Sequence, residues 1–185
     1  MLSPRSSSTN DRYRIQSVAR ALTMLRAFSA SETELGAAQI SKQLHLDLTT
    51  TFRMLMTLQA QGFVEQNPAD GKYRLGTSCL ELGSRYIKGN DVRRSALSLM
   101  NSIRDQFGET VHLAILEGTQ VIYLEKLNGL HPIGVMSSHV GGNAPAYCTG
   151  IGKVLLAYLS EEEVCSRFRG VKLEQFTPTT ITKLS

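Results

Sequence analysis

The chain has 185 residues, a net charge of +4 and three cysteines, Cys79, Cys148 and Cys165. No apolar run is long enough to cross a bilayer, so we expect no membrane partner. The three cysteines cannot all pair with one another and no signal peptide precedes them, so a reducing cytoplasm is the simplest location. The four histidines lack metal-ligand spacing, and the glycines beside Lys153 match neither a P-loop nor a dinucleotide fingerprint. The sequence therefore predicts no metal, no cofactor and no catalytic residues.

Excess positive charge lies in the first 76 residues, which hold nine Lys or Arg against six Asp or Glu. This is mildly basic and is consistent with contacts to phosphates. Residues 1–14 are rich in serine and predict a disordered basic arm that carries Arg5, Arg12 and Arg14. Such an arm can reach a DNA groove, although a disordered terminus without a role fits equally well.

Three helices are predicted in the region that follows. From Ile15 to Phe28, an apolar stripe of Val18, Leu22, Leu25 and Phe28 should close a small core. A second helix runs from about Leu35 to Leu44, with Lys42 pointing away from its apolar side. The chain then turns over residues 45–47, the length of turn typical of a helix-turn-helix, and His45 has to adopt a positive φ.

The third predicted helix, from Leu48 to about Ala60, is the candidate DNA-reading element. Asp47 is a good N-cap for it. One face is apolar, with Leu48, Thr51, Phe52, Leu55 and Leu58. The opposite face has short hydroxyls around a single arginine and no acid, namely Thr49, Thr50, Arg53 and Thr57. Arginine and threonine can bond or contact base edges, so this face favours DNA reading. An ordinary polar helix face is the alternative interpretation.

A hairpin is predicted next, with strands at 63–66 and 72–75 joined through Asp70-Gly71. Lys72 and Arg74 alternate with Tyr73 and Leu75, so one edge should be basic while the other side packs inward. Residues 15–76 thus read as a winged helix-turn-helix domain. A charged, solvated hairpin is the alternative.

The middle of the chain predicts two helices. Residues 77–90 form a linker, with a helix from Thr77 to Lys88 that stops at Gly89-Asn90. Asp91 should cap the next helix, which ends at Gly108. One face of this helix carries an apolar stripe of Val92, Ala96, Met100, Ile103 and Phe107. The stripe could pack on a sheet or on another subunit.

The last part of the chain predicts a small α/β region. Residues 111–116 and 121–127 read as an antiparallel hairpin, Ile133–Ser137 could add a third strand, and residues 141–145 form a loop. A helix from about Cys148 to Leu159 follows. The free amides at its start favour an anion, so the candidate ligand site comprises Thr149, Gly150, Ile151 and Gly152. Both glycines could equally serve helix packing. Cys148 near this helix start is expected to have a lowered pKa.

Several segments resemble the IclR family of bacterial transcriptional regulators. The similar segments are 18–22 (VARAL), 48–55 (LTTTFRML), 61–64 (QGFV), 73–76 (YRLG), 110–114 (TVHLA) and 147–157 (YCTGIGKVLLA). The resemblance implies a homodimer or tetramer that binds a palindromic or repeated DNA operator and responds to a small organic acid. It also implies that Thr49, Thr50 and Arg53 lie on the recognition helix, that Lys72 and Arg74 lie on the wing, and that Gly150 and Ile151 hold the effector's carboxylate.

The predicted fold class is α+β, with an N-terminal winged helix-turn-helix, a linker helix and an incomplete GAF-like α/β effector domain. By the resemblance, residues 91–185 are the N-terminal half of that domain, so we expect a truncated domain that binds effector poorly or not at all. The predicted function is sequence-specific, DNA-binding transcription regulation without enzyme activity. The alternatives are a small-molecule-binding or redox enzyme that uses Cys148, and a winged-helix module that binds a protein.

Overall fold

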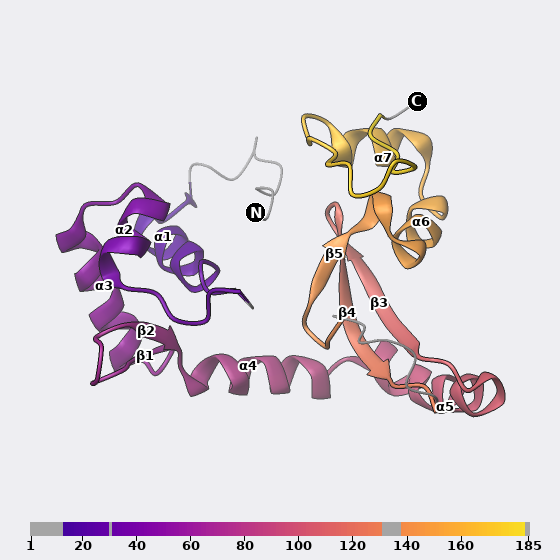
Figure 1. The fold of residues 1–185 in the computed structure, drawn as a ribbon, viewed down its shortest axis with the longest axis horizontal. Helices are drawn as coiled ribbons and strands as arrows, with labels where there is room; N and C mark the ends of the chain where they lie inside the picture. The colour runs from indigo at the N-terminus through magenta and orange to yellow at the C-terminus, as the bar shows by residue number, and fades with distance from the viewer. Residues whose placement is uncertain (1–12, 30, 131–137, 184–185) are drawn as a thin grey trace. The chain divides into compact units, whose positions relative to one another are not determined.

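The computed structural model describes residues 13–29, 31–130 and 138–183. It forms two compact units, the first ending at Tyr86 and the second beginning at Ile87. Arg5 and Arg12 of the predicted arm, and the strand predicted at residues 133–137, lie outside the described residues. The mixture of an N-terminal helical unit and a C-terminal unit with a small sheet confirms the predicted α+β class (Figure 1).

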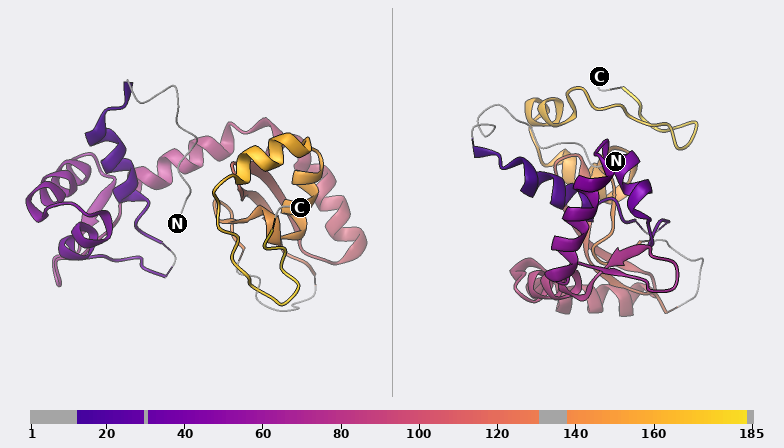
Figure 2. Two further views of the ribbon diagram at one scale, coloured as in Figure 1. Left: turned by 90° about the horizontal axis from the view of Figure 1, so that it is seen from above. Right: turned by 90° about the vertical axis from the view of Figure 1, so that its left-hand side faces the viewer.

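The first unit contains the predicted helices and hairpin. Helices α1 (Gln16–Leu25), α2 (Ala37–Leu44) and α3 (Leu48–Ala60) bundle together, with the antiparallel strands β1 (Val64–Gln66) and β2 (Tyr73–Leu75) beside them (Figures 1 and 2). Helix α4 (Thr77–Lys88) follows and has the predicted bounds. Helix α2 begins two residues later than expected, because Leu35 pairs with Tyr73 in a β-bridge through bonds of 2.9 and 2.8 Å.

The core of this unit uses a different face of α1 from the one predicted. Met24 is fully buried and Phe28 is buried, with Ala21 and Leu25 packed beside them at i, i+3, i+4 and i+7 spacing. Val18 and Leu22 are each 52% exposed, so the stripe that contained them was partly wrong. The physical reason is that the true stripe lies one residue further round the helix and shares only Leu25 and Phe28 with the predicted one.

The buried face of α3 is also narrower than predicted. Thr51, Leu55 and Leu58 are buried, and the Thr51 hydroxyl donates to the Asp47 carbonyl at 3.0 Å, which satisfies it in the core. The remaining buried members of the core are Leu35, Ile40, Val64 and Tyr73. A small three-helix unit covers only a narrow strip of α3, so Leu48 and Phe52 remain outside this core.

The second unit is built on a three-stranded antiparallel sheet. Its order is β3 (Val111–Glu117), β4 (Gln120–Leu127) and β5 (Asn143–Pro145), with a register shift between Leu113 and Ala114. Strand β5 lies where we expected a loop, because its three residues pair with Gln120, Val121 and Ile122. Helix α5 (Asp91–Phe107) lies at one end of the sheet in Figure 1, and the α6 and α7 region lies at the other.

The starts of the helices in this unit differ from expectation. Asn90, not Asp91, caps α5, since its side-chain oxygen accepts from the Arg93 amide at 2.9 Å. A short 3-10 helix η2 (Ala146–Cys148) precedes α6 (Gly150–Ala157). Helix α7 (Glu161–Phe168) was not predicted, although its capping box of Ser160 and Glu163 is a sequence signal for a helix start.

The core of the second unit contains Ala114, Val121, Ala146 and Phe168. Helix α5 contacts β3 and β4, which favours the sheet-packing alternative for its apolar stripe. Only Met100 of that stripe is buried, however, while Val92 and Phe107 are more than half exposed.

Candidate DNA-binding surface and effector site

Helix α3 is positioned by the turn that precedes it. His45 adopts the left-handed conformation, with φ of 51°, as the short turn required. Asp47 then caps the helix, since its side chain accepts from the Thr50 amide at 2.7 Å. This hydrogen bonding from Thr50 lowers the pKa of Asp47 below its ordinary value. The carboxylate is therefore ionised at neutral pH and holds the first turn of α3 in place.

The polar face of α3 is open to solvent. Thr49, Arg53 and Thr57 are exposed and Thr50 is half-buried. No described residue forms an ion pair or hydrogen bond with the Arg53 guanidinium, which leaves it available. The Thr57 hydroxyl donates to the Arg53 carbonyl at 2.9 Å and is therefore already engaged. Thr49 and Arg53 are therefore the most open members of the predicted reading surface, while the Thr50 side chain also hydrogen-bonds Asp47.

Sequence reasoning missed an exposed apolar edge beside this face. Leu48, Phe52 and Met56 are 54%, 49% and 47% exposed and follow one another at i, i+4 and i+8 along α3. Leu48 and Phe52 were predicted on one apolar face with Thr51, Leu55 and Leu58, but only the last three are buried. The exposure of Leu48 and Phe52 could not be foreseen, since the helical wheel gives the direction of an apolar side chain but not the width of the core that receives it.

The first three helices carry no acidic residue. Arg20 on α1, Lys42 on α2 and Arg53 on α3 are their only charged side chains. The acids of this unit lie in loops, at the Asp47 cap, in the hairpin and on α4. The charged side chains within α1, α2 and α3 are therefore all cationic, which suits a polyanion.

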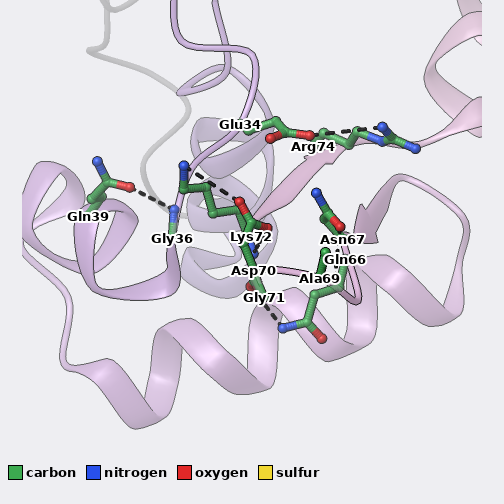
Figure 3. Close-up of polar contacts among 10 residues, drawn as sticks. All are labelled: Glu34, Gly36, Gln39, Gln66, Asn67, Ala69, Asp70, Gly71, Lys72 and Arg74. Atoms are coloured by element: carbon green, nitrogen blue, oxygen red, sulfur yellow. Dashed lines mark hydrogen bonds and ion pairs between the residues drawn. The ribbon is translucent and has the colours of Figure 1, made fainter.

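The hairpin presents its cations differently (Figure 3). Arg74 lies opposite Glu65 in the β1–β2 ladder and donates to it at 2.5 Å, and Glu34 lies 3.9 Å from the same guanidinium. Lys72 is 3.6 Å from Asp70. The predicted basic edge is therefore largely neutralised by its own acids. Tyr73 packs inward as predicted, whereas Leu75 is 43% exposed and does not.

The hairpin loop is held by side chains of its own. The Asn67 side chain accepts from the Ala69 amide at 3.0 Å, and Gln66 donates to the Gly71 carbonyl at 2.9 Å (Figure 3). Gly71 has φ of 72°, the conformation that the Asp-Gly pair predicted. The loop between the two strands is therefore held by hydrogen bonds, and Lys72 and Arg74 lie directly after it in the sequence.

The candidate effector site is at the start of α6. Thr149 caps this helix and its hydroxyl accepts from the Gly152 amide at 3.2 Å, so the expectation that all four amides are free was wrong for Gly152. A side chain at Gly152 would meet the Ala146 carbonyl oxygen at 2.2 Å, which shows that this glycine serves close packing. At Gly150 a side chain would meet nothing within 4 Å. Gly150 and Ile151 remain as the open part of the predicted site.

Cys148 does not have the properties of a nucleophile. Its thiol is 3.6 Å from the Pro145 carbonyl oxygen, and burial raises the pKa of the thiol. The lowered pKa expected from the nearby helix start is therefore wrong. Desolvation outweighs the lowering effects of a backbone hydrogen bond and of Lys153, and Cys148 lies in the 3-10 turn before α6 and not in its first turn.

A polar group surrounds His112 on the sheet. His112 Nε2 is 2.7 Å from the Ser138 hydroxyl, its ring packs on Tyr123 at 5.3 Å, and the Lys126 ammonium donates to the Ser138 carbonyl at 2.9 Å. Burial, and secondly Lys126, lower the pKa of His112. Tyr123 and Ser138 also line a hollow of about 100 Å³ with Asn143. His112 is thus a neutral structural or pocket residue at neutral pH.

Two kinds of site are absent from the part of the chain that the structure describes. No group of three or more His, Cys, Asp or Glu side chains could hold a metal ion there. No helix among the described residues is both long and apolar enough to span a membrane.

Two family models match this chain. Residues 17–68 match the IclR helix-turn-helix domain, and residues 84–185 match the C-terminal domain of the bacterial transcriptional regulator IclR. The chain belongs to the IclR family. The two matches together cover more than half of the sequence, in the order expected from the resemblance.

Individual relatives agree with the family models. The chain is 39% identical to the HTH-type transcriptional regulator XynR of Escherichia coli K12 over 167 residues, which cover 90% of this chain and 66% of XynR. It is 33% identical to the regulator KdgR of the same strain, over 91% of this chain and 63% of KdgR. The chain therefore spans about two thirds of the length of these curated relatives.

A solved structure shares the fold. An IclR homologue from Microbacterium hydrocarbonoxydans, crystallised in complex with 4-hydroxybenzoate, superposes with a TM-score of 0.73 at 27% identity. The similarity covers 91% of this chain and 69% of that one. The relatives are named as regulators, so the comparisons offer no support for the enzyme alternative.

Proposed function

We propose that this chain acts as a sequence-specific, DNA-binding transcriptional regulator of the IclR type. The observation that carries the proposal is the exposed, acid-free face of α3, where Arg53 has no partner among the described residues and lies beside Thr49 and Thr50. Arg53 would bond a guanine edge, and the two threonines would offer hydroxyl and methyl groups to neighbouring bases. Because the family acts on chromosomal DNA, the proposed location is the cytoplasm.

The remaining predicted residues take supporting roles in this proposal. Lys42 is an exposed cation that would contact a phosphate, and Thr57 lies at the far end of the reading face. Lys72 is exposed as well but contributes less charge, because Asp70 lies 3.6 Å from it. Arg74 contributes less charge, since Glu65 and Glu34 face it. The domain limits proposed are a basic arm at 1–14, a winged helix-turn-helix at 15–76, a linker at 77–90 and an effector region at 91–185.

The exposed apolar edge of α3 extends the reading surface. Phe52 and Met56 lie on the flank of the helix that also bears Thr49, and aromatic or aliphatic side chains in a major groove contact the methyl group of thymine. We therefore expect the operator to contain thymines at the positions that this flank reaches.

We propose a homodimer or tetramer as the binding form. Exposed apolar side chains occur on α1 and α4, and Leu80 on α4 is 75% exposed. No residue of α4 is buried within the chain, which is unusual for a 12-residue helix unless another surface covers it. A dimer would present two copies of α3, so we expect an operator with two half-sites.

The ligand proposed for the second unit is a small carboxylic acid. The amides of Gly150 and Ile151 lie at the positive end of α6, next to the open space at Gly150, while Thr149 and Gly152 shape the turn. The homologue in complex with 4-hydroxybenzoate shows that one related protein binds such an acid. Calorimetric titration of the chain with 4-hydroxybenzoate and with the neutral analogue phenol tests this part. Saturable binding of the acid alone supports the ligand class and overturns the expectation of poor or absent effector binding, whereas equal binding of acid and phenol would reject an anion site.

The DNA-binding proposal is tested by selecting bound duplexes from a random pool at a stated salt concentration. Enrichment of a motif with two related half-sites supports the regulator, and its spacing reports the geometry of the dimer. Recovery of unenriched sequence would reject sequence-specific recognition. A protein-interaction module, the other alternative, would retain no duplex at all.

A further inference from the structure

The feature that the proposed function leaves unused is a hollow between α1 and the turn before α3. It has a volume of about 190 Å³, several times the share of about 30 Å³ that a water molecule takes in the liquid. Its polar lining comes from Arg14, Gln16, Arg20, Thr23 and His45, and the remainder from Ala19, Leu44 and Leu46. None of the described residues that line it is acidic, so this recess of the helical unit has a cationic lining.

Arg20 is the residue that makes this recess unusual. Its side chain is half-buried, yet no described residue gives it an ion pair or a hydrogen bond. Holding a guanidinium partly out of water without a counter-charge costs free energy, and proteins normally pair such groups. The neighbouring Thr23 hydroxyl gives no compensation, because it donates to the Ala19 carbonyl at 2.9 Å. An anion in the recess would supply the missing partner.

The start of α1 adds to the positive field in the recess. Ile15 precedes α1 without any side-chain cap, and the first turn contains no acid. The partial positive charge of the uncapped helix end is therefore unopposed at Gln16, which itself lines the hollow. By contrast, Asp47 satisfies the corresponding end of α3.

The position of the recess identifies the anion. Leu44, His45 and Leu46 form part of its wall, and α3 begins at Leu48, two residues after Leu46. A helix whose first turn enters the major groove brings the residues just before it close to the backbone of the duplex. We propose that the recess binds a phosphate of the DNA backbone beside the groove that α3 reads, with Arg20 as its principal ligand and Gln16 and His45 as flanking groups. This inference rests on the proposed function.

A phosphate seat has a specific signature in binding measurements. Arg20→Gln should weaken binding to the selected operator and to a scrambled duplex by the same factor, about tenfold for one charge-assisted hydrogen-bonded contact. It should also reduce the slope of log K against log salt by about 0.9 for each protomer, the value for one phosphate lost. Arg20→Lys keeps the charge and should largely keep the slope.

Arg26→Gln is the matched control. Arg26 lies directly after α1, is exposed, does not line the recess and carries the same charge. If general attraction were responsible, the two glutamine variants would lose affinity and slope equally, and that result would overturn the proposal. Thermal unfolding of each variant measures how much is folded, and affinities are expressed per folded protein.

Ethylation interference on the operator provides the second measurement. Ethylation of the bound phosphate should weaken DNA binding by the wild-type chain and should not change DNA binding by Arg20→Gln. One interference position in each half-site should therefore disappear in the variant. Identical interference patterns would overturn the phosphate seat while leaving the regulator intact. Failure of the wild-type chain to bind any duplex would instead reject the proposed function itself.

Discussion

Helices α3 and α6 begin in similar ways but present different chemistry. Asp47 caps the first with a bond of 2.7 Å to Thr50, and Thr149 caps the second with one of 3.2 Å to Gly152. At α3 the exposed groups are side chains, among them Thr49 and Arg53. At α6 they are backbone groups around Gly150, because its neighbour Gly152 is packed against Ala146.

This difference explains why one site was easier to predict than the other. Side chains on a helix point in directions that the sequence gives directly, so the polar face of α3 follows from spacing. Backbone amides exist at every helix start, and only the surrounding packing decides which ones are open. Five measurements test this difference between the two helix starts and the side chains around them.

The largest effect should come from the second glycine of α6. Gly152→Ala would place a methyl group 2.2 Å from the Ala146 carbonyl oxygen, so we expect a loss of about 3 kcal/mol in the free energy of unfolding, the upper range for overpacking. Gly150→Ala is the matched control: its methyl group would have no atom within 4 Å, so we expect little or no loss in the free energy of unfolding. Denaturant unfolding measures both, and equal losses would show that the two glycines do not differ as described.

At α3, Arg53→Ala should weaken operator binding by about 2 kcal/mol and relax the base preference at one position of each half-site. Binding to a scrambled duplex should change much less. Arg85→Ala on α4 removes the same charge from a residue paired with Glu81 and serves as control. Titration of labelled duplexes measures these affinities, and an equal loss on both duplexes for Arg53→Ala would contradict base reading.

The apolar flank of α3 predicts a smaller effect on thymine recognition. Replacing the contacted thymine by deoxyuridine removes one methyl group and should weaken the wild-type chain by about 0.8 kcal/mol, roughly fourfold. Phe52→Ala should bind the two duplexes equally. If deoxyuridine at every thymine of the operator leaves wild-type binding unchanged, the flank does not read methyl groups.

The Asp47 cap predicts a pH dependence. Its pKa is lower in the folded chain, so its contribution to stability is full above the ordinary aspartate pKa of about 3.9 and is lost as the pH falls through the lowered value. The difference in unfolding free energy between wild type and Asp47→Ala should therefore be constant near neutrality and vanish in acid. Asp47→Asn retains a capping side chain and should lose much less at neutral pH. A difference that persists unchanged at low pH would argue against the cap.

The smallest effect concerns the hairpin. Glu65→Gln should release Arg74 and strengthen binding to all duplexes by a few tenths of a kcal/mol, with a steeper salt dependence. Glu81→Gln changes the net charge equally on α4 and is the control. If both variants behave alike in salt titrations, Arg74 is not restrained by its cross-strand partner.

Local signals predicted most elements of the fold. The bounds of α3 and α4, the positive φ of His45 and the Asp-Gly hairpin all follow from interactions between residues near in sequence. Strand β5 and the exposure of Phe52 depend on partners distant in sequence, which no local pattern specifies. The pairing of Arg74 with Glu65 required the strand register, so the available charge of the hairpin was overestimated.

The candidate sites divide in the same way. Thr49 and Arg53 were found from helical spacing. The half-buried state of Arg20, which has no ion-pair partner among the described residues, depends instead on how α1 meets the turn before α3. Helix α7 is the exception, because the Ser160–Glu163 capping box was present in the sequence and was overlooked.

If α3 reads base edges, the ratio of the affinities for the selected operator and for a scrambled duplex must be large. The chain should bind the selected operator at least about 10³-fold more tightly than a scrambled duplex of equal length at physiological salt. Equal affinities for the two duplexes, with the chain folded, would contradict the account.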